Sequence, residues 1–255
     1  MYPKPKKRLG QCFLVDKNIQ NKLAEACGLR KSDTVLEIGP GRGEITALLV
    51  RQVKKVIAIE IDSGLCEILR QKFSSYKNFM LFNKDILKMD LSKYKNLKIV
   101  ANLPYYISTP ILAHLLKYRN SIKTIFCTLQ KELAMRLVAG AGTKIYGAFS
   151  CFVQFYTRPK IVFFIKNESF RPKPKVDSCF MELKIFSKPP VKVKDEQLFF
   201  KLVRTAFNQR RKQIKNSLIR ILTKDKITRY LKTLKLKPGV RAENLSLRDF
   251  AALAK

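Results

Sequence analysis

The residues best suited to chemistry in this chain lie in one short stretch, Ala101–Tyr106. It follows an apolar run that predicts a buried strand, and Pro104 has no N–H with which to continue that strand. The backbone must therefore turn there, at a sheet edge of the kind where ligands bind in α/β proteins. The turn offers the amide of Asn102, the carbonyls of Leu103 and Pro104, and the ring of Tyr105. Together these groups suit a planar, amino-substituted base better than a phosphate or a metal, although a plain strand-ending turn would have the same pattern.

A glycine loop and two carboxylates precede this stretch, each at the end of a predicted strand. Strand, loop Gly39–Gly43 and helix form the opening of a nucleotide-binding βα unit. The loop is not the dinucleotide fingerprint, since Glu44 stands where its last glycine would be, and it lacks the lysine of a P-loop. Glu60 can bond ribose hydroxyls, and Asp85 can accept a hydrogen bond from an adenine amino group. Two acidic groups favour a cationic ligand over pyrophosphate, which indicates S-adenosyl-L-methionine; solvated strand ends are the alternative for each carboxylate.

The charge of the chain indicates a polyanionic partner. There are 52 Lys and Arg against 19 Asp and Glu, a net charge of +33 and a pI near 10.1. Such an excess favours binding to nucleic acid, or less often to a membrane surface. No apolar run is long enough to span a membrane, and the amino terminus lacks the apolar region of a secretory signal. The six cysteines include no C-x-x-C pair and His114 is the only histidine, so we expect no metal site and a reducing, cytoplasmic location.

The order of the predicted elements indicates an α/β fold. Strands alternate with helices through the helix that begins at Glu132, which predicts a mostly parallel sheet. Beyond it, β-rich runs at Phe149–Tyr156, Lys160–Ile165 and Val176–Phe186 predict an antiparallel edge. A proline-containing linker at 187–190 then separates two expected domains, 1–186 and 187–255. The helices expected in the second domain are Glu196–Phe207, Arg211–Leu222, Ile227–Leu234 and Leu247–Leu253.

Several motifs of the chain are similar to those of one enzyme family. Besides the stretches above, Leu9–Leu14 is similar to the family's amino-terminal cofactor motif, and Phe170–Ser178 to its Phe-x-Pro-x-Pro-Lys-Val-Asp-Ser motif. On these motifs the chain resembles the KsgA/Dim1/Erm family of ribosomal RNA adenine dimethyltransferases over nearly its whole length. Ala206–Lys212 and Arg241–Leu245 resemble the carboxyl-terminal signature of the KsgA branch rather than the Erm branch. The resemblance implies a Rossmann-like class I methyltransferase domain followed by a small all-α, RNA-binding domain.

The same resemblance implies an activity. The expected enzyme uses S-adenosyl-L-methionine to dimethylate two adjacent adenosines near the 3′ end of small-subunit ribosomal RNA during ribosome biogenesis. Its expected partner is the RNA of an assembly intermediate, and we expect a monomer without a metal and away from membranes. Two alternatives stay open: an Erm-type methyltransferase of large-subunit RNA, and a non-catalytic ribosome-assembly or transcription factor that keeps the fold for RNA binding alone. The intact pocket residues weigh against the second alternative.

The resemblance also assigns residues to the cofactor. They are Cys12, Leu14, Gly39, Gly41, Glu60, Asp85 and Asn102. Cys12 departs from the family, which has Asn or, less often, His at this position. A main-chain contact here would tolerate cysteine, whereas a side-chain contact would weaken cofactor binding.

The residues of the 101–106 stretch suit methyl transfer to an adenine. The exocyclic nitrogen of adenine is a weak nucleophile, because its lone pair is delocalised into the ring. Asn102 and the carbonyl of Leu103 or Pro104 can accept hydrogen bonds from this amino group, and these bonds strengthen as the nitrogen gains positive charge. The target base must leave its stack to reach such a pocket, and we expect Tyr105 and Phe170 to stack on its two faces. No general base is needed before attack.

A basic surface is expected on the carboxyl-terminal helices. If these helices were continuous, Arg204, Arg211 and Lys215 would share one face. The candidate RNA-binding residues are Arg204, Arg210, Arg211, Lys212 and Lys215. A solvated helix face is the ordinary alternative, but the surplus charge of the chain favours RNA. We expect strong salt dependence and little sequence recognition by this domain.

Overall fold

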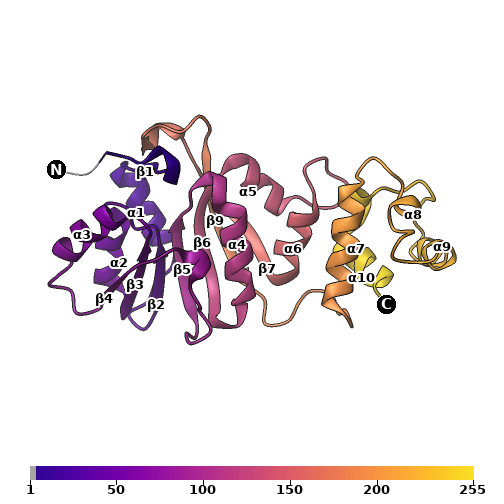
Figure 1. Ribbon diagram of the computed structural model, residues 1–255, viewed down its shortest axis with the longest axis horizontal. Helices are drawn as coiled ribbons and strands as arrows, with labels where there is room; N and C mark the ends of the chain where they lie inside the picture. The colour runs from indigo at the N-terminus through magenta and orange to yellow at the C-terminus, as the bar shows by residue number, and fades with distance from the viewer. Residues whose placement is uncertain (1–3) are drawn as a thin grey trace. The chain divides into compact units, whose positions relative to one another are not determined.

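The computed structural model describes residues 4–255, which form two compact units (Figure 1). The first unit extends to Ala134 and includes Lys160–Ile185, and the second consists of Met135–Pro159 and Phe186–Lys255. The units therefore differ from the sequence-based domains 1–186 and 187–255 in the placement of residues 135–159 and of Phe186. That division into domains stays a prediction.

A seven-stranded sheet organises the first unit, in the order β4-β3-β2-β5-β6-β9-β7. All pairs from β4 to β6 are parallel, and β6 pairs antiparallel with β9, so the expected α/β sheet with an antiparallel edge is confirmed. The carboxyl ends of the five parallel strands therefore meet at one edge. The strands are β2 (Thr34–Ile38), β3 (Lys55–Glu60), β4 (Phe79–Asn83), β5 (Leu97–Asn102), β6 (Ile122–Gln130), β7 (Thr157–Ile165) and β9 (Ser178–Ile185).

Two helices of the first unit, α1 and α3, begin where an aspartate side chain satisfies their first N–H groups. Asp16 accepts from the N–H of Asn18 and of Ile19, and Asp62 accepts from that of Gly64. The helices are α1 (Lys17–Ala26), α2 (Glu44–Gln52), α3 (Ser63–Lys72), α4 (Ser108–Lys117) and the start of α5 (Lys131–Val138). Short 3₁₀ turns lie at Lys7–Leu9, Ile86–Lys88, Tyr105–Ile107, Arg119–Ser121 and Asn167–Ser169.

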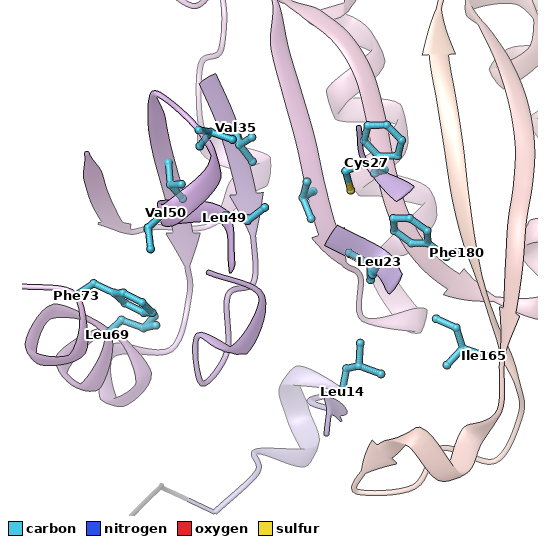
Figure 2. Close-up of a cluster of buried hydrophobic side chains, with 14 of the residues drawn as sticks. Leu14, Leu23, Cys27, Val35, Leu49, Val50, Leu69, Phe73, Ile165 and Phe180 are labelled. Carbon is cyan, nitrogen blue, oxygen red and sulfur yellow. The ribbon is translucent and has the colours of Figure 1, made fainter. Parts of the chain in front are cut away.

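Helices α1, α2 and α3 bury their apolar stripes against the sheet in one cluster (Figure 2). Leu23, Leu49 and Leu69 come from the three helices, and Val35 and Phe180 come from strands β2 and β9. Each of these side chains is almost completely buried. This burial of apolar area stabilises the sheet and fixes the positions of its carboxyl-terminal strand ends.

A two-stranded ribbon joins the amino-terminal motif to the late proline-rich motif. Strand β1 (Phe13–Leu14) pairs antiparallel with β8 (Phe170–Arg171). The side-chain amide of Gln20, on α1, donates to the Leu14 carbonyl at 2.7 Å. Two segments far apart in the sequence are therefore held side by side at the edge where the parallel strands end.

The second unit is helical and contains a correction to the expected elements. Phe149–Tyr156, expected as a strand, is helix α6 (Ala148–Tyr156), and only the residues after it extend as β7. A short apolar run rich in aromatic residues fits a buried strand and a buried helix equally well. Here the Ser150 hydroxyl accepts from the Gly147 N–H at 3.1 Å, at the start of the helix, and Phe155 packs on Phe199 with ring centroids 5.0 Å apart.

One of the carboxyl-terminal helices is much shorter than expected. Helix α7 (Glu196–Asn208) ends with its carboxyl cap at Gln209, and the helix expected over 211–222 is reduced to α8 (Ile214–Ser217). The helices are therefore not continuous, so the condition under which Arg204, Arg211 and Lys215 would share one face is not met. Apolar spacing alone does not reveal where the second of these helices begins and ends. Helices α9 (Lys224–Thr233) and α10 (Leu247–Leu253) and a 3₁₀ turn at Ala242–Asn244 complete the unit. None of the helices within residues 4–255 is long and apolar enough to cross a lipid bilayer.

Candidate active site

A cavity in the first unit opens where strands β2, β3 and β5 end. Most of the residues that the sequence predicts for the site line it together. They are Cys12, Gly39, Gly41, Glu60, Asp85, Asn102, Leu103, Pro104, Tyr105 and Phe170. Leu14 is the exception: it lies in the buried cluster and lines a smaller cavity behind the glycine loop.

The glycine loop lies in a conformation that other residues rarely adopt. Gly41 has φ +60°, and a Cβ there would lie 3.0 Å from the ring of Phe13. Gly43 has φ +78°, and a Cβ there would lie 2.6 Å from the ring of Phe73. Both positions therefore require glycine: Gly41 because it lies close to the amino-terminal segment, and Gly43 because it packs against α3.

Glu60 is held by backbone groups at the bottom of this cavity. Its Oε2 accepts from the Gly41 N–H at 3.1 Å and its Oε1 from the Asp62 N–H at 3.0 Å. Burial raises the pKa of the Glu60 carboxyl, and the two backbone hydrogen bonds oppose that rise. A buried, oriented carboxylate beside a glycine loop is suited to accept hydrogen bonds from the hydroxyls of a ribose.

Asp85 lies at the end of β4, beside the same cavity. It is half-buried, and its Oδ1 accepts from the Leu87 N–H at 2.9 Å. This bond fixes the carboxylate at the start of the 3₁₀ turn Ile86–Lys88. The structure thus brings it close to Glu60, as the parallel arrangement of the strands predicts.

Asn102 is oriented by the main chain of Cys12, the residue that differs from the family's usual asparagine or histidine. Its Nδ2 donates to the Cys12 carbonyl at 2.9 Å, so the link does not depend on the side chain of residue 12. Burial raises the pKa of the Cys12 thiol, which keeps it neutral. Among the described residues, no donor meets the Asn102 Oδ1.

The two carbonyls after Asn102 differ in their partners. The Pro104 carbonyl already accepts from the Ser108 hydroxyl at 2.8 Å and from the Ile107 N–H at 3.2 Å. The Leu103 N–H donates to the Thr128 carbonyl at 3.3 Å, whereas the Leu103 carbonyl has no partner within residues 4–255. The turn therefore presents two open acceptors, from Asn102 and Leu103.

Comparisons with known proteins assign this arrangement to a family. The profile described as Ribosomal RNA adenine dimethylase matches residues 3–255. "Ribosomal RNA small subunit methyltransferase A" of Caldanaerobacter subterraneus subsp. tengcongensis is 42% identical, over 98% of this chain and 96% of its own length, and that of Geobacillus thermodenitrificans is 42% identical over 98% and 89%. The chain belongs to the ribosomal RNA adenine dimethylase family. As a member, this dimethylase is an S-adenosyl-L-methionine-dependent methyltransferase that acts on small-subunit ribosomal RNA.

Solved structures agree with this assignment of the dimethylase. A dimethyladenosine transferase from Plasmodium falciparum superposes with a TM-score of 0.83 at 27% identity, over 94% of this chain and 95% of the other. The 23S rRNA methyltransferase ErmE superposes with a TM-score of 0.78 at 25% identity, over 94% and 97%. The fold is thus shared with the Erm branch, while the curated relatives at about 40% identity are small-subunit methyltransferases.

Tyr105 and Phe170 line the cavity of the dimethylase from opposite segments of the chain. The Tyr105 hydroxyl lies 2.5 Å from the Ser178 hydroxyl, which ties its ring to the start of β9. Phe170, on β8, is only 1% exposed and belongs to the buried cluster as well as to the cavity lining. Tyr105 therefore offers an accessible ring, and Phe170 a ring already held by packing.

The structure adds three residues that the sequence did not single out. Lys6 pairs with Asp62 at 2.6 Å between Nζ and Oδ1, and Gln11 Nε2 donates to Asp62 Oδ2 at 2.9 Å. The Lys6 N–H donates to Gln11 Oε1 at 2.7 Å. These bonds hold the amino-terminal segment beside the cavity. The signals for them in the sequence were the place of Gln11 within the motif Leu9–Leu14 and the position of Asp62 just before a helix.

The expected RNA-binding residues lie in the second unit, but not on one continuous helix. Arg204 is exposed on α7, Arg211 and Lys212 are exposed between α7 and α8, and Lys215 is half-buried on α8. Arg210 is engaged within the unit: its Nε donates to Glu243 at 2.8 Å, and it also bonds the Lys144 carbonyl. No cluster of three or more side chains suited to a metal occurs in the part of the chain that the structure describes.

Proposed function

We propose that this dimethylase converts two adjacent adenosines near the 3′ end of small-subunit ribosomal RNA to dimethyladenosines. The observation that carries the proposal is the pair of open acceptors from Asn102 and Leu103, in the same cavity as Glu60. We further propose that the substrate is an assembly intermediate of the small subunit and that the enzyme acts as a cytoplasmic monomer. The reducing location is supported by the six free cysteines, five of which have buried side chains.

The cavity fits S-adenosyl-L-methionine, which supplies a methyl group on a sulfonium when bound. Glu60 accepts hydrogen bonds from the ribose hydroxyls, and Asp85 accepts one from the adenine amino group. Gly39 and Gly41 present only backbone to the cavity. A Cβ at Gly41 would push against the ring of Phe13, which lines the same cavity. The two carboxylates attract the cationic ligand and repel pyrophosphate.

Asn102 and Leu103 perform the catalytic work by accepting hydrogen bonds. Their oxygens bond the two hydrogens of the target amino group and hold its lone pair toward the methyl group. As the nitrogen gains positive charge, these fixed dipoles stabilise the transition state more than the ground state. The Tyr105 ring positions the extruded base by stacking on one of its faces, whereas the Phe170 ring, which is only 1% exposed, supports the wall of the cavity.

Two acceptors also suit a second methylation. After the first transfer the methylated nitrogen releases one proton to water and retains a single hydrogen. One of the two oxygens can bond that hydrogen while the other adjoins the new methyl group. Neither oxygen carries a full charge, so the loss of one hydrogen bond leaves no buried, unpaired anion. The same site therefore serves both steps.

Transfer of labelled methyl groups to unmethylated small ribosomal subunits tests the proposal, with naked large-subunit RNA as the comparison. We expect label in adjacent dimethyladenosines of the small subunit only, and a loss of about 100-fold or more in rate for Asn102→Ala, as for removal of one oxyanion-hole donor. Label in large-subunit RNA would instead indicate Erm-type activity. No label in either RNA, with cofactor and RNA still bound, would leave a binding factor.

A further inference from the structure

An exposed aromatic side chain on the edge strand of the first unit has no role in the site described above. Phe164, on β7, is 56% exposed. Its neighbours Phe163 and Ile165 point to the other face of the strand, where both join the buried cluster. Strand alternation therefore presents Phe164 on the opposite face, away from that cluster.

A basic side chain lies over this ring. The Nζ of Lys131 is 5.5 Å from the centroid of Phe164, and Lys131 itself is exposed at the start of α5. An accessible aromatic face beside an ammonium group is the combination that single-stranded nucleic acid binds, by base stacking and by attraction of phosphate.

This pair is directly connected to the segment that holds Tyr105. The Lys131 N–H donates to the Asp177 carbonyl at 3.0 Å. The next residue, Ser178, bears the hydroxyl that contacts Tyr105. The Asp177 carboxylate also accepts from the Asn167 N–H at 3.1 Å, which fixes the chain as it leaves β7. The exposed ring and the target-base pocket are therefore held by one short backbone segment.

The surrounding charge favours RNA as the occupant. The segment 166–175, which follows β7, carries four exposed basic side chains and one acidic side chain, and the latter pairs with one of the four at 3.3 Å. These basic residues are Lys166, Arg171, Lys173 and Lys175. Such a positive field attracts a phosphate backbone.

We propose that Phe164 and Lys131 form a stacking platform for an unpaired base of the RNA that flanks the target adenosine. Phe164 stacks on the base, and Lys131 contacts the adjoining phosphate. The identity of the RNA rests on the proposed function above, whereas the platform can be tested by binding alone.

The test uses the full chain and an unmethylated transcript of the 3′ region of small-subunit RNA. Phe164→Ala should weaken RNA binding about tenfold, the effect of losing one base stack, while cofactor affinity and Tm stay unchanged. Phe164→Tyr, which keeps the aromatic face, should bind as the unsubstituted chain does. Lys131→Met should reduce the slope of log Kd against the logarithm of the salt concentration by about one. The matched control is Met80→Ala, at the opposite edge of the same sheet and 39% exposed, which should leave RNA binding unchanged.

Equal RNA binding by Phe164→Ala and the unsubstituted chain would overturn the platform. A loss seen with whole subunits but not with the transcript would assign the surface to a ribosomal protein, and would overturn it too. If the unsubstituted chain transferred no methyl groups, yet Phe164→Ala still weakened RNA binding, the proposed function would fail and the platform would stand.

Discussion

The ion pair between Lys6 and Asp62 ties the amino-terminal segment to the start of α3, and breaking it should weaken cofactor binding. The segment contributes Gln11, Cys12 and Phe13 to the cavity lining. Asp62 is bonded by Lys6 at 2.6 Å and by Gln11 at 2.9 Å, and its side chain is 2% exposed. A segment released from Asp62 must be ordered again when the cofactor binds, at a cost in free energy.

The magnitude follows from the exposure of the two partners. The Lys6 side chain is 39% exposed, so solvent screens the pair and its contribution is about 1 kcal/mol rather than the several kcal/mol of a fully buried pair. If the pair contributes only when the segment is in place, its loss should raise the Kd for S-adenosyl-L-methionine about fivefold.

A double-mutant cycle measures this coupling. Titration calorimetry would compare Lys6→Met, Asp62→Asn and the double variant, with Lys4→Met, an exposed neighbouring lysine, as the matched control. Asp62→Asn keeps an oxygen that can accept from the Gly64 N–H at the start of α3, so the helix cap is retained. The double variant should bind no more weakly than Asp62→Asn alone. Strictly additive losses, or a loss for Lys4→Met as large as for Lys6→Met, would refute the reasoning.

The coupling should also be lost in acid. Burial alone would raise the pKa of Asp62, but the hydrogen bonds from Lys6 and Gln11 outweigh it and hold the pKa below its ordinary value. A carboxyl with a depressed folded-state pKa contributes stability above the unfolded pKa of about 3.9, and this contribution falls away as the pH drops through the folded value. Between pH 6 and 8 the coupling should therefore be constant.

Two further substitutions test other parts of the site. Burial raises the pKa of Glu37 to about 8, although Thr46 donates to it at 2.7 Å. Its contribution to stability is therefore complete below about pH 4.5 and is lost as the pH rises through 8. Glu37→Gln should reduce the fall in the free energy of unfolding between pH 6 and pH 9, measured with denaturant, and an equal fall in the variant and the unsubstituted chain would contradict this. Cys12→Ser should change the Kd for the cofactor less than threefold, because Asn102 bonds the main chain of residue 12; a change of tenfold in calorimetry would show that the side chain takes part.

The positions of Glu60, Asp85 and Asn102 were predictable because each follows a strand of a parallel sheet. The period of the apolar residues identifies such strands, and their common direction brings the residues that follow them to one edge. Local capping was predictable in the same way: Asp16 precedes a helical pattern and caps α1. These predictions depend only on neighbours within a few residues.

Pairings between distant segments were not predictable. Nothing in the sequence around Lys6 indicates that its partner is Asp62, and nothing around Cys12 indicates that its carbonyl meets Asn102. Helix α6 was mistaken for a strand because its aromatic residues favour strands while tertiary packing decides the outcome. The sequence also could not show whether the Leu103 or the Pro104 carbonyl is free to accept a hydrogen bond from a substrate. The Ser108 hydroxyl donates to the Pro104 carbonyl, and this bond depends on the formation of helix α4.

These long-range bonds connect cofactor binding to catalysis. The Cys12 carbonyl that orients the Asn102 amide lies in the segment that Asp62 holds through Gln11. A segment free to leave the cavity also leaves Asn102 Nδ2 without its acceptor, and the amide can then turn its nitrogen toward the target amino group. The amide N–H group in that position would repel the hydrogens of the target amino group, whereas the amide oxygen accepts a hydrogen bond from them. Asp62→Asn should therefore lower kcat under saturating cofactor as well as raise the Kd, whereas a substitution that affects the cofactor alone would leave kcat unchanged.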